Sequence, residues 1–196
     1  MSDVESVASG ASSVTLLWLP VGAGGHVVKH TSRWWELAQA AVQRRRPARL
    51  FHAALEVVAD GERYVIEMAP AWGVPAAERG VVASGPVGMR WLGRSRFFRY
   101  EVRRWRDGVI PDRAWAVGGP LTLSGETEAS RRLLDAVPRV PILVWGSTVR
   151  PVGDMWNSNS LVSWLLVQAG IPAALTPPQG GRAPGWAAGL AVAAAG

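Results

Sequence analysis

The pattern of hydrophobic positions in the first two thirds of the chain predicts β-strands. Residues 14–19 form an apolar run with β-branched members, which is typical of a buried strand. Residues 50–58 and 63–68 flank Asp60-Gly61, a dipeptide that favours the tight turn of a β-hairpin. Shorter segments predict further strands at residues 26–30, 80–83, 97–105 and 186–194. We therefore expect an antiparallel sheet that includes most of the middle of the chain.

A second pattern, an apolar run that begins at a polar turn, predicts a central helix. Asn157-Ser158-Asn159-Ser160 supplies the residue types that cap helix N-termini, and residues 161–167 are almost wholly apolar. Gly170 and Pro172 end the run. A helix that is apolar all round belongs in the interior of a domain. Two further helices are expected at residues 34–45 and 126–137, each with a capping residue before it and a proline after it.

These elements together predict the α+β class, with an antiparallel sheet packed against a central buried helix. The length of 196 residues is that of one domain, which we place at residues 14–196. Residues 1–13 are small and polar, and we expect them to be disordered.

Composition narrows the class of protein. The hydrophobic content of 48% is enough for a well-buried core, and most of the 11 Trp are expected to fill it. The net charge of +6 comes from 20 Arg and one Lys, Lys29, and supports weak, salt-sensitive binding to anionic surfaces. With no Cys, disulfides, thiolate catalysis and cysteine-based zinc sites are excluded.

We expect the chain to carry no targeting or membrane-spanning segment. Its N-terminus has Asp3 and Glu5 instead of the basic and apolar regions of a signal peptide. No apolar run reaches the roughly 18 residues that a membrane span needs. We expect a cytoplasmic protein.

The hairpin brings a histidine near a carboxylate. If Asp60-Gly61 is a two-residue turn, His52 and Glu67 are diagonal neighbours on one face of the two strands. A carboxylate in this place orients an imidazole and raises its basicity, as in a nucleophilic triad. A solvated polar face with a chance histidine is the alternative interpretation.

A histidine on the first strand of a hairpin, followed later by an Asn-rich turn that opens a buried helix, resembles the circularly permuted papain-like fold. This group contains the NlpC-like and lecithin:retinol acyltransferase-like proteins. The resemblance rests on Phe51-His52-Ala53-Ala54-Leu55-Glu56-Val57 and Asn157-Ser158-Asn159-Ser160-Leu161, and it covers roughly residues 50–170. It implies that His52 is the general base, that Ser158 occupies the position of the nucleophilic Cys, and that Glu67 takes the third, polar position.

Serine at the cysteine position leaves several interpretations open. A Ser hydroxyl is far less acidic than a thiol, so it needs an oriented base and an oxyanion hole. Ser158 is a serine nucleophile, a decayed site or an engineered replacement of Cys, or else the Asn157–Ser160 turn only caps its helix.

Other constellations predict little chemistry. His26 and His30 are too far apart on a strand to share a metal, and residues 22–25 lack the spacing of nucleotide-binding motifs, so we expect no metal and no cofactor. Residues 90–106 hold seven Arg among five aromatic side chains. This pattern is found in single-stranded nucleic-acid binders, but we favour a solvated strand face and do not expect nucleic acid as a partner.

The sequence thus supports a main hypothesis and two alternatives. The main one is a hydrolase or acyltransferase that acts on an amide or ester bond of a small-molecule or peptide substrate through Ser158, His52 and Glu67. The first alternative is a non-catalytic protein that binds a ligand or partner on the same fold. The second is a nucleic-acid-binding module that uses residues 94–106.

Overall fold

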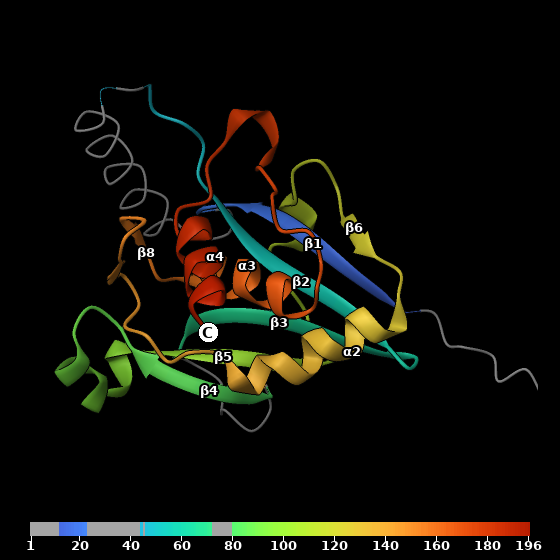
Figure 1. The fold of residues 1–196 in the computed structure, drawn as a ribbon, viewed down its shortest axis with the longest axis horizontal. Helices are drawn as coiled ribbons and strands as arrows, with labels where there is room; N and C mark the ends of the chain where they lie inside the picture. The colour runs from blue at the N-terminus through green and yellow to red at the C-terminus, as the bar shows by residue number, and fades with distance from the viewer. Residues whose placement is uncertain (1–11, 23–43, 45, 72–79) are drawn as a thin grey trace, which may run out of the picture.

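A computed structural model describes residues 12–22, 44, 46–71 and 80–196. Its main feature is a six-stranded antiparallel sheet in the order β4-β5-β3-β2-β1-β6. The strands are β1 (Ser13–Pro20), β2 (Phe51–Ala59), β3 (Glu62–Pro70), β4 (Val81–Pro86), β5 (Arg99–Arg106) and β6 (Leu121–Ser124). Figure 1 shows the sheet with its helices on one side, so the expected α+β class is confirmed.

The central hairpin forms in the predicted register. Ala59 pairs with Glu62 and Glu56 with Val65, while Asp60 and Gly61 take φ values of 54° and 79°. Two successive positive φ values characterise the type I′ turn, whose twist matches that of the flanking strands. The Asp-Gly dipeptide therefore sets the register of β2 against β3.

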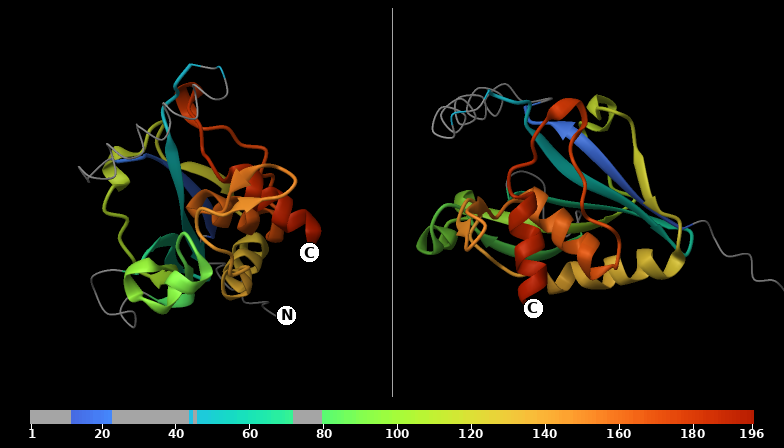
Figure 2. Two further views of the ribbon diagram at one scale, coloured as in Figure 1. Left: turned by 90° about the vertical axis from the view of Figure 1, so that its left-hand side faces the viewer. Right: turned by 45° about the horizontal axis from the view of Figure 1, so that its top comes forward.

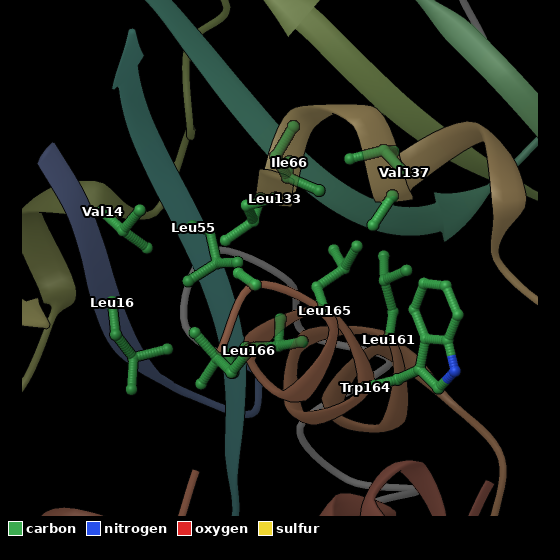
Figure 3. Close-up of a cluster of buried hydrophobic side chains, with 14 of the residues drawn as sticks. Val14, Leu16, Leu55, Ile66, Leu133, Val137, Leu161, Trp164, Leu165 and Leu166 are labelled. Atoms are coloured by element: carbon green, nitrogen blue, oxygen red, sulfur yellow. The ribbon is translucent and has the colours of Figure 1, made fainter. Parts of the chain in front are cut away.

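Three α-helices cover one face of the sheet: α2 (Thr127–Ala136), α3 (Ser158–Gln168) and α4 (Trp186–Ala195). Helix α3 is the predicted central helix, and Leu161, Leu165 and Leu166 in it are completely buried. Figure 3 shows Leu165 and Leu166 near Leu55 of β2 and Leu133 of α2, and Leu161 near Val137. The main core lies between α3 and the sheet.

The opposite face of the sheet holds a smaller apolar cluster. It consists of Leu17, Leu19, Ala54, Val65 and Ile110. Strand β1 therefore contributes to two cores, with Leu16 and Trp18 on the helical face and Leu17 and Leu19 on the other. A strand buried on both faces has no polar alternation, which explains its continuous apolar run.

The C-terminal segment is a helix, and the expected strand at residues 186–194 is wrong. Helix α4 contains six Ala, the residue with the highest helix propensity. Gly189 allows its close contact with α3, because a Cβ there would lie 2.1 Å from the Ser160 carbonyl oxygen. Trp186 at its start packs on Trp18, with ring centroids 5.1 Å apart.

Residues 87–98 form a compact projection, which we call the aromatic–arginine lobe. It follows β4, contains the short 3-10 helices η2 (Arg90–Arg94) and η3 (Arg96–Phe98), and leads into β5. Figures 1 and 2 show it extending beyond one end of the sheet. The expected strand at residues 97–105 therefore begins later, at Arg99, and the expected strand at residues 80–83 is longer, ending at Pro86.

The remaining elements are short. They are the 3-10 helices η4 (Arg113–Trp115), η5 (Val137–Arg139) and η6 (Pro178–Gly180), and the small hairpin β7 (Thr148–Val149) with β8 (Asp154–Met155). Within the part of the chain that the structure describes, no helix is long and apolar enough to cross a bilayer.

Some expectations fall outside the described residues. These are the strand at residues 26–30, the helix at residues 34–45 apart from Arg44, and the disorder of residues 1–11. Ser13, which was expected to precede the domain, begins β1.

Candidate functional site

The start of α3 is a dense polar network. Asn157 caps the helix, and its Oδ1 accepts hydrogen bonds from the backbone N–H groups of Asn159 and Ser160 at 2.9 and 3.4 Å. The Ser160 hydroxyl accepts a bond from the Asn157 N–H at 3.0 Å and lies 2.7 Å from the Gly185 carbonyl oxygen. This reciprocal arrangement is a capping box, so the predicted capping role of the Asn-Ser turn is confirmed.

Asn159 joins the helix to the sheet. Its Oδ1 accepts a hydrogen bond from the Ala53 N–H of β2 at 2.7 Å, and its Nδ2 donates to the Phe51 carbonyl at 3.0 Å. The same Nδ2 donates to the Pro184 carbonyl at 2.8 Å, so the side chain also holds the segment before α4. One buried amide thus ties three segments of the chain together.

Ser158 differs from its neighbours because its hydroxyl has no hydrogen-bond partner among the described residues. It occupies the first position of α3, where the backbone N–H groups of the helix start favour negative charge. Its exposed fraction is 9%. A nucleophile at this position would also need a base within hydrogen-bond distance.

The predicted base, His52, lies on the other side of the sheet. His52 pairs with Leu19 across β1 and β2, and paired side chains of antiparallel strands share a face. Leu19 belongs to the smaller core. Phe51, Ala53 and Leu55 instead belong to the main core with α3. Strand alternation therefore turns His52 away from Ser158.

Burial determines the protonation of His52. Desolvation lowers its pKa below the usual 6.5, although the negative charges of Glu67 and Asp112 act in the opposite direction. His52 and Glu67 thus lie on the same face of the sheet, the face of the smaller core, and the charge of Glu67 acts on the imidazole. Ser158 lies on the opposite face.

Glu67 is engaged in a buried ion cluster. Its carboxylate accepts a hydrogen bond from the Arg103 guanidinium at 2.7 Å, and Glu101 lies 3.2 Å from the same guanidinium. Arg103 and Glu101 are only 8% and 6% exposed. The Glu67 carboxylate neutralises the buried positive charge of Arg103, so the role of Glu67 that the contacts show is structural.

The arginine-rich stretch divides into two parts with different roles. On β5, Arg103 is buried, Arg104 donates to the Leu134 carbonyl at 3.4 Å, and Arg106 pairs with Glu62 at 2.7 Å. On the lobe, Arg90, Arg94 and Arg96 are exposed and pair with no carboxylate of the described residues. The prediction of a solvated strand face is therefore only partly correct, because the exposed arginines lie on the lobe and those of β5 make internal contacts.

Three arginines of this region line a cavity of about 250 Å³ between the lobe and β4. They are Arg90 and Arg94 of η2 and Arg99 of β5, and Ser84 completes the polar lining. Arg99 Nε donates to Ser84 Oγ at 3.1 Å, which fixes one guanidinium at the wall. Among the described residues that line the cavity, three are basic and none is acidic.

Close backbone packing holds this cavity in shape. A Cβ on Gly93 would lie 2.7 Å from Pro86 Cβ, and one on Gly85 would lie 2.4 Å from the Tyr100 ring. The lobe therefore seats directly on β4, and Tyr100 is fixed below by its hydrogen bond to the Leu143 carbonyl at 2.8 Å. The backbone segments that carry the three cavity arginines are therefore closely packed against each other.

Sequence reasoning missed both Asn159 and the arginine cavity. The signal for the cavity is that residues 80–100 contain four Arg and neither Asp nor Glu. The described residues contain no group of three His, Asp or Glu side chains that could hold a metal ion. Comparisons of the chain with protein families, with curated proteins and with solved structures find no match.

Proposed function

We propose that this protein is a non-catalytic binding protein that holds an anionic, phosphate-bearing ligand in the cavity formed by Arg90, Arg94 and Arg99. The observation that carries the proposal is that three arginines line one shallow cavity, and none of its described lining residues is acidic. Guanidinium groups recognise phosphate through paired, charge-assisted hydrogen bonds.

The environment of these arginines supports binding over a purely structural role. Other described arginines pair with carboxylates, as Arg103 does with Glu67 and Arg131 with Asp60. Like charges that converge without a carboxylate repel each other, and a bound anion relieves that repulsion. The Ser84 hydroxyl adds a neutral donor at the wall.

The test is calorimetric titration of the full chain with pyrophosphate. We expect saturable binding that weakens at least tenfold in an Arg90→Ala, Arg94→Ala double variant, because two guanidinium contacts are lost. Arg139→Ala is the matched control, since Arg139 is exposed and lies outside the cavity. Absence of binding, or equal weakening by Arg139→Ala, would contradict the proposal.

A serine hydrolase or acyltransferase is the second candidate, favoured by the Ser158 hydroxyl, which has no described partner at the start of α3. It requires a base that neither His52 nor Glu67 supplies from the opposite face. We expect a serine-reactive phosphonate to leave Ser158 unlabelled. Labelling that depends on His52, measured by intact-mass spectrometry of the His52→Ala variant, would restore the enzyme hypothesis.

A further inference from the structure

We propose that the aromatic–arginine lobe docks on an anionic phospholipid surface, with a lipid phosphate in the arginine cavity and the apolar side chains of the lobe in the interfacial layer. This inference rests on the proposed function, because the same cavity supplies the phosphate site. It adds the source of the phosphate and the way in which the protein approaches it.

The first support is the concentration of exposed apolar side chains on the lobe. Met89, Trp91, Phe97 and Phe98 are 57%, 66%, 63% and 44% exposed. Four of the ten exposed large hydrophobic side chains of the described residues therefore fall within this one short segment. Such a concentration marks an interaction surface, because isolated exposed apolar residues would be scattered.

The second support is that basic groups alternate with these apolar groups. Arg90 and Arg94 flank Trp91, and Arg96 precedes Phe97 with its guanidinium 5.3 Å from the ring centroid. Aromatic side chains prefer the bilayer interface, and arginines beside them contact lipid phosphates. The lobe combines both features without an intervening acidic residue.

The third support is position. The lobe projects beyond one end of the sheet in Figure 1 and in the right view of Figure 2. A flat surface can therefore approach the lobe before it reaches the described part of the sheet. The cavity lies at the base of the same segment, between η2 and β4, within reach of a headgroup.

A nucleic acid fits this surface less well than a membrane. Single-stranded nucleic acid needs a basic track with free aromatic faces for stacking. The extended track on β5 is occupied by internal contacts of Arg103, Arg104 and Arg106, and the Arg96 guanidinium lies over the Phe97 ring. The exposed side chains of η2 and η3 project from two short 3-10 helices and not from a strand surface on which successive bases could stack.

The experiment is co-sedimentation of the full chain with two kinds of vesicle. One kind is pure phosphatidylcholine, and the other holds equal parts of phosphatidylcholine and phosphatidylglycerol. We expect binding to the anionic vesicles only, with an affinity that falls as salt is raised. The Trp91→Ser, Phe97→Ser double variant should bind them at least tenfold more weakly and should still bind pyrophosphate.

Trp115→Ser is the matched control, because Trp115 is 63% exposed but lies on η4, outside the lobe. It should bind vesicles like the unmodified chain. If the protein binds pyrophosphate but not anionic vesicles, the membrane inference is wrong and the proposed function stands. If it binds neither pyrophosphate nor vesicles, the membrane inference and the proposed function are both wrong. Vesicle binding that the double variant retains, or tighter binding to a single-stranded oligonucleotide at physiological salt, would also overturn it.

Discussion

At the scale of single residues, two neighbours at the start of α3 have opposite roles. Asn159 is 3% exposed and bonds the backbone of β2 through both side-chain atoms, whereas the Ser158 hydroxyl has no described partner. The resemblance to papain-like proteins directs attention to Ser158. The hydrogen bonds direct it to Asn159, which connects the helix to the sheet.

Replacement of these neighbours by alanine should separate the two roles. Asn159→Ala leaves the buried Ala53 N–H without an acceptor, so we expect the free energy of unfolding to fall by about 3 kcal/mol. Ser158→Ala removes no described hydrogen bond and should change it by less than about 0.5 kcal/mol. Chemical denaturation measures both, and a larger loss for Ser158→Ala would show that its hydroxyl has a structural partner.

His52 should make stability depend on pH in a narrow window. Its folded-state pKa lies below the unfolded value of 6.5, so the unfolded chain binds a proton more readily. The contribution of neutral His52 to the free energy of unfolding is therefore fully present well above pH 6.5. It is lost as the pH falls through 6.5 toward the folded-state pKa. Thermal unfolding between pH 7.5 and about pH 5.5 should show this decline, and His52→Gln should reduce its slope. An unchanged slope would mean that His52 is solvated.

The sequence determines the register of the hairpin and the cap of α3, but it does not determine which face His52 occupies. Strand β2 has buried apolar side chains on both faces, with Ala54 in the smaller cluster and Leu55 in the main core. Alternation alone cannot decide which of two buried faces meets a helix. The choice depends on packing against α3, which local sequence does not encode.

At the scale of elements, α3 is the helix that joins the sheet to α4. It contacts β2 through Asn159 and the leucines of Figure 3, and it contacts α4 at Gly189. Its prediction from sequence was accurate, because an apolar run between a polar cap and a glycine has few other structures available. Helix α4 was missed since an alanine-rich apolar run shows no period.

A charge placed at two positions of α3 should distinguish buried from exposed sites. Leu165 is completely buried, so Leu165→Asp places an unpaired charge in the core and should prevent stable folding at 25 °C. Val167 is 39% exposed, and Val167→Asp should leave the protein folded. Circular dichroism with thermal unfolding measures both. A folded Leu165→Asp protein would contradict the central position of α3.

At the scale of the whole molecule, the two faces of the sheet and the lobe carry different sets of side chains. One face carries the helices and the main core, the other carries His52 and the buried ion cluster, and the lobe carries the exposed arginines and aromatic side chains. The α+β class followed from the order of periodic segments. The resemblance to the permuted papain-like fold stays a prediction, and so does its serine chemistry.

The cavity could not be predicted because it forms between segments that are adjacent only after folding. Arg99 reaches Ser84 across two paired strands, and η2 seats on β4 through Gly93 and Pro86. The sequence shows an arginine-rich stretch, but only the fold separates the arginines that are used internally from those that converge.

The most direct test of the account is an NMR titration of arginine Nε–Hε resonances with pyrophosphate, assigned through single Arg→Lys variants. We expect saturable shifts for Arg90, Arg94 and Arg99, with Arg139 and the backbone amide of Ser158 unchanged. Shifts that centre on Ser158 and His52, or none at the three cavity arginines, would contradict the account.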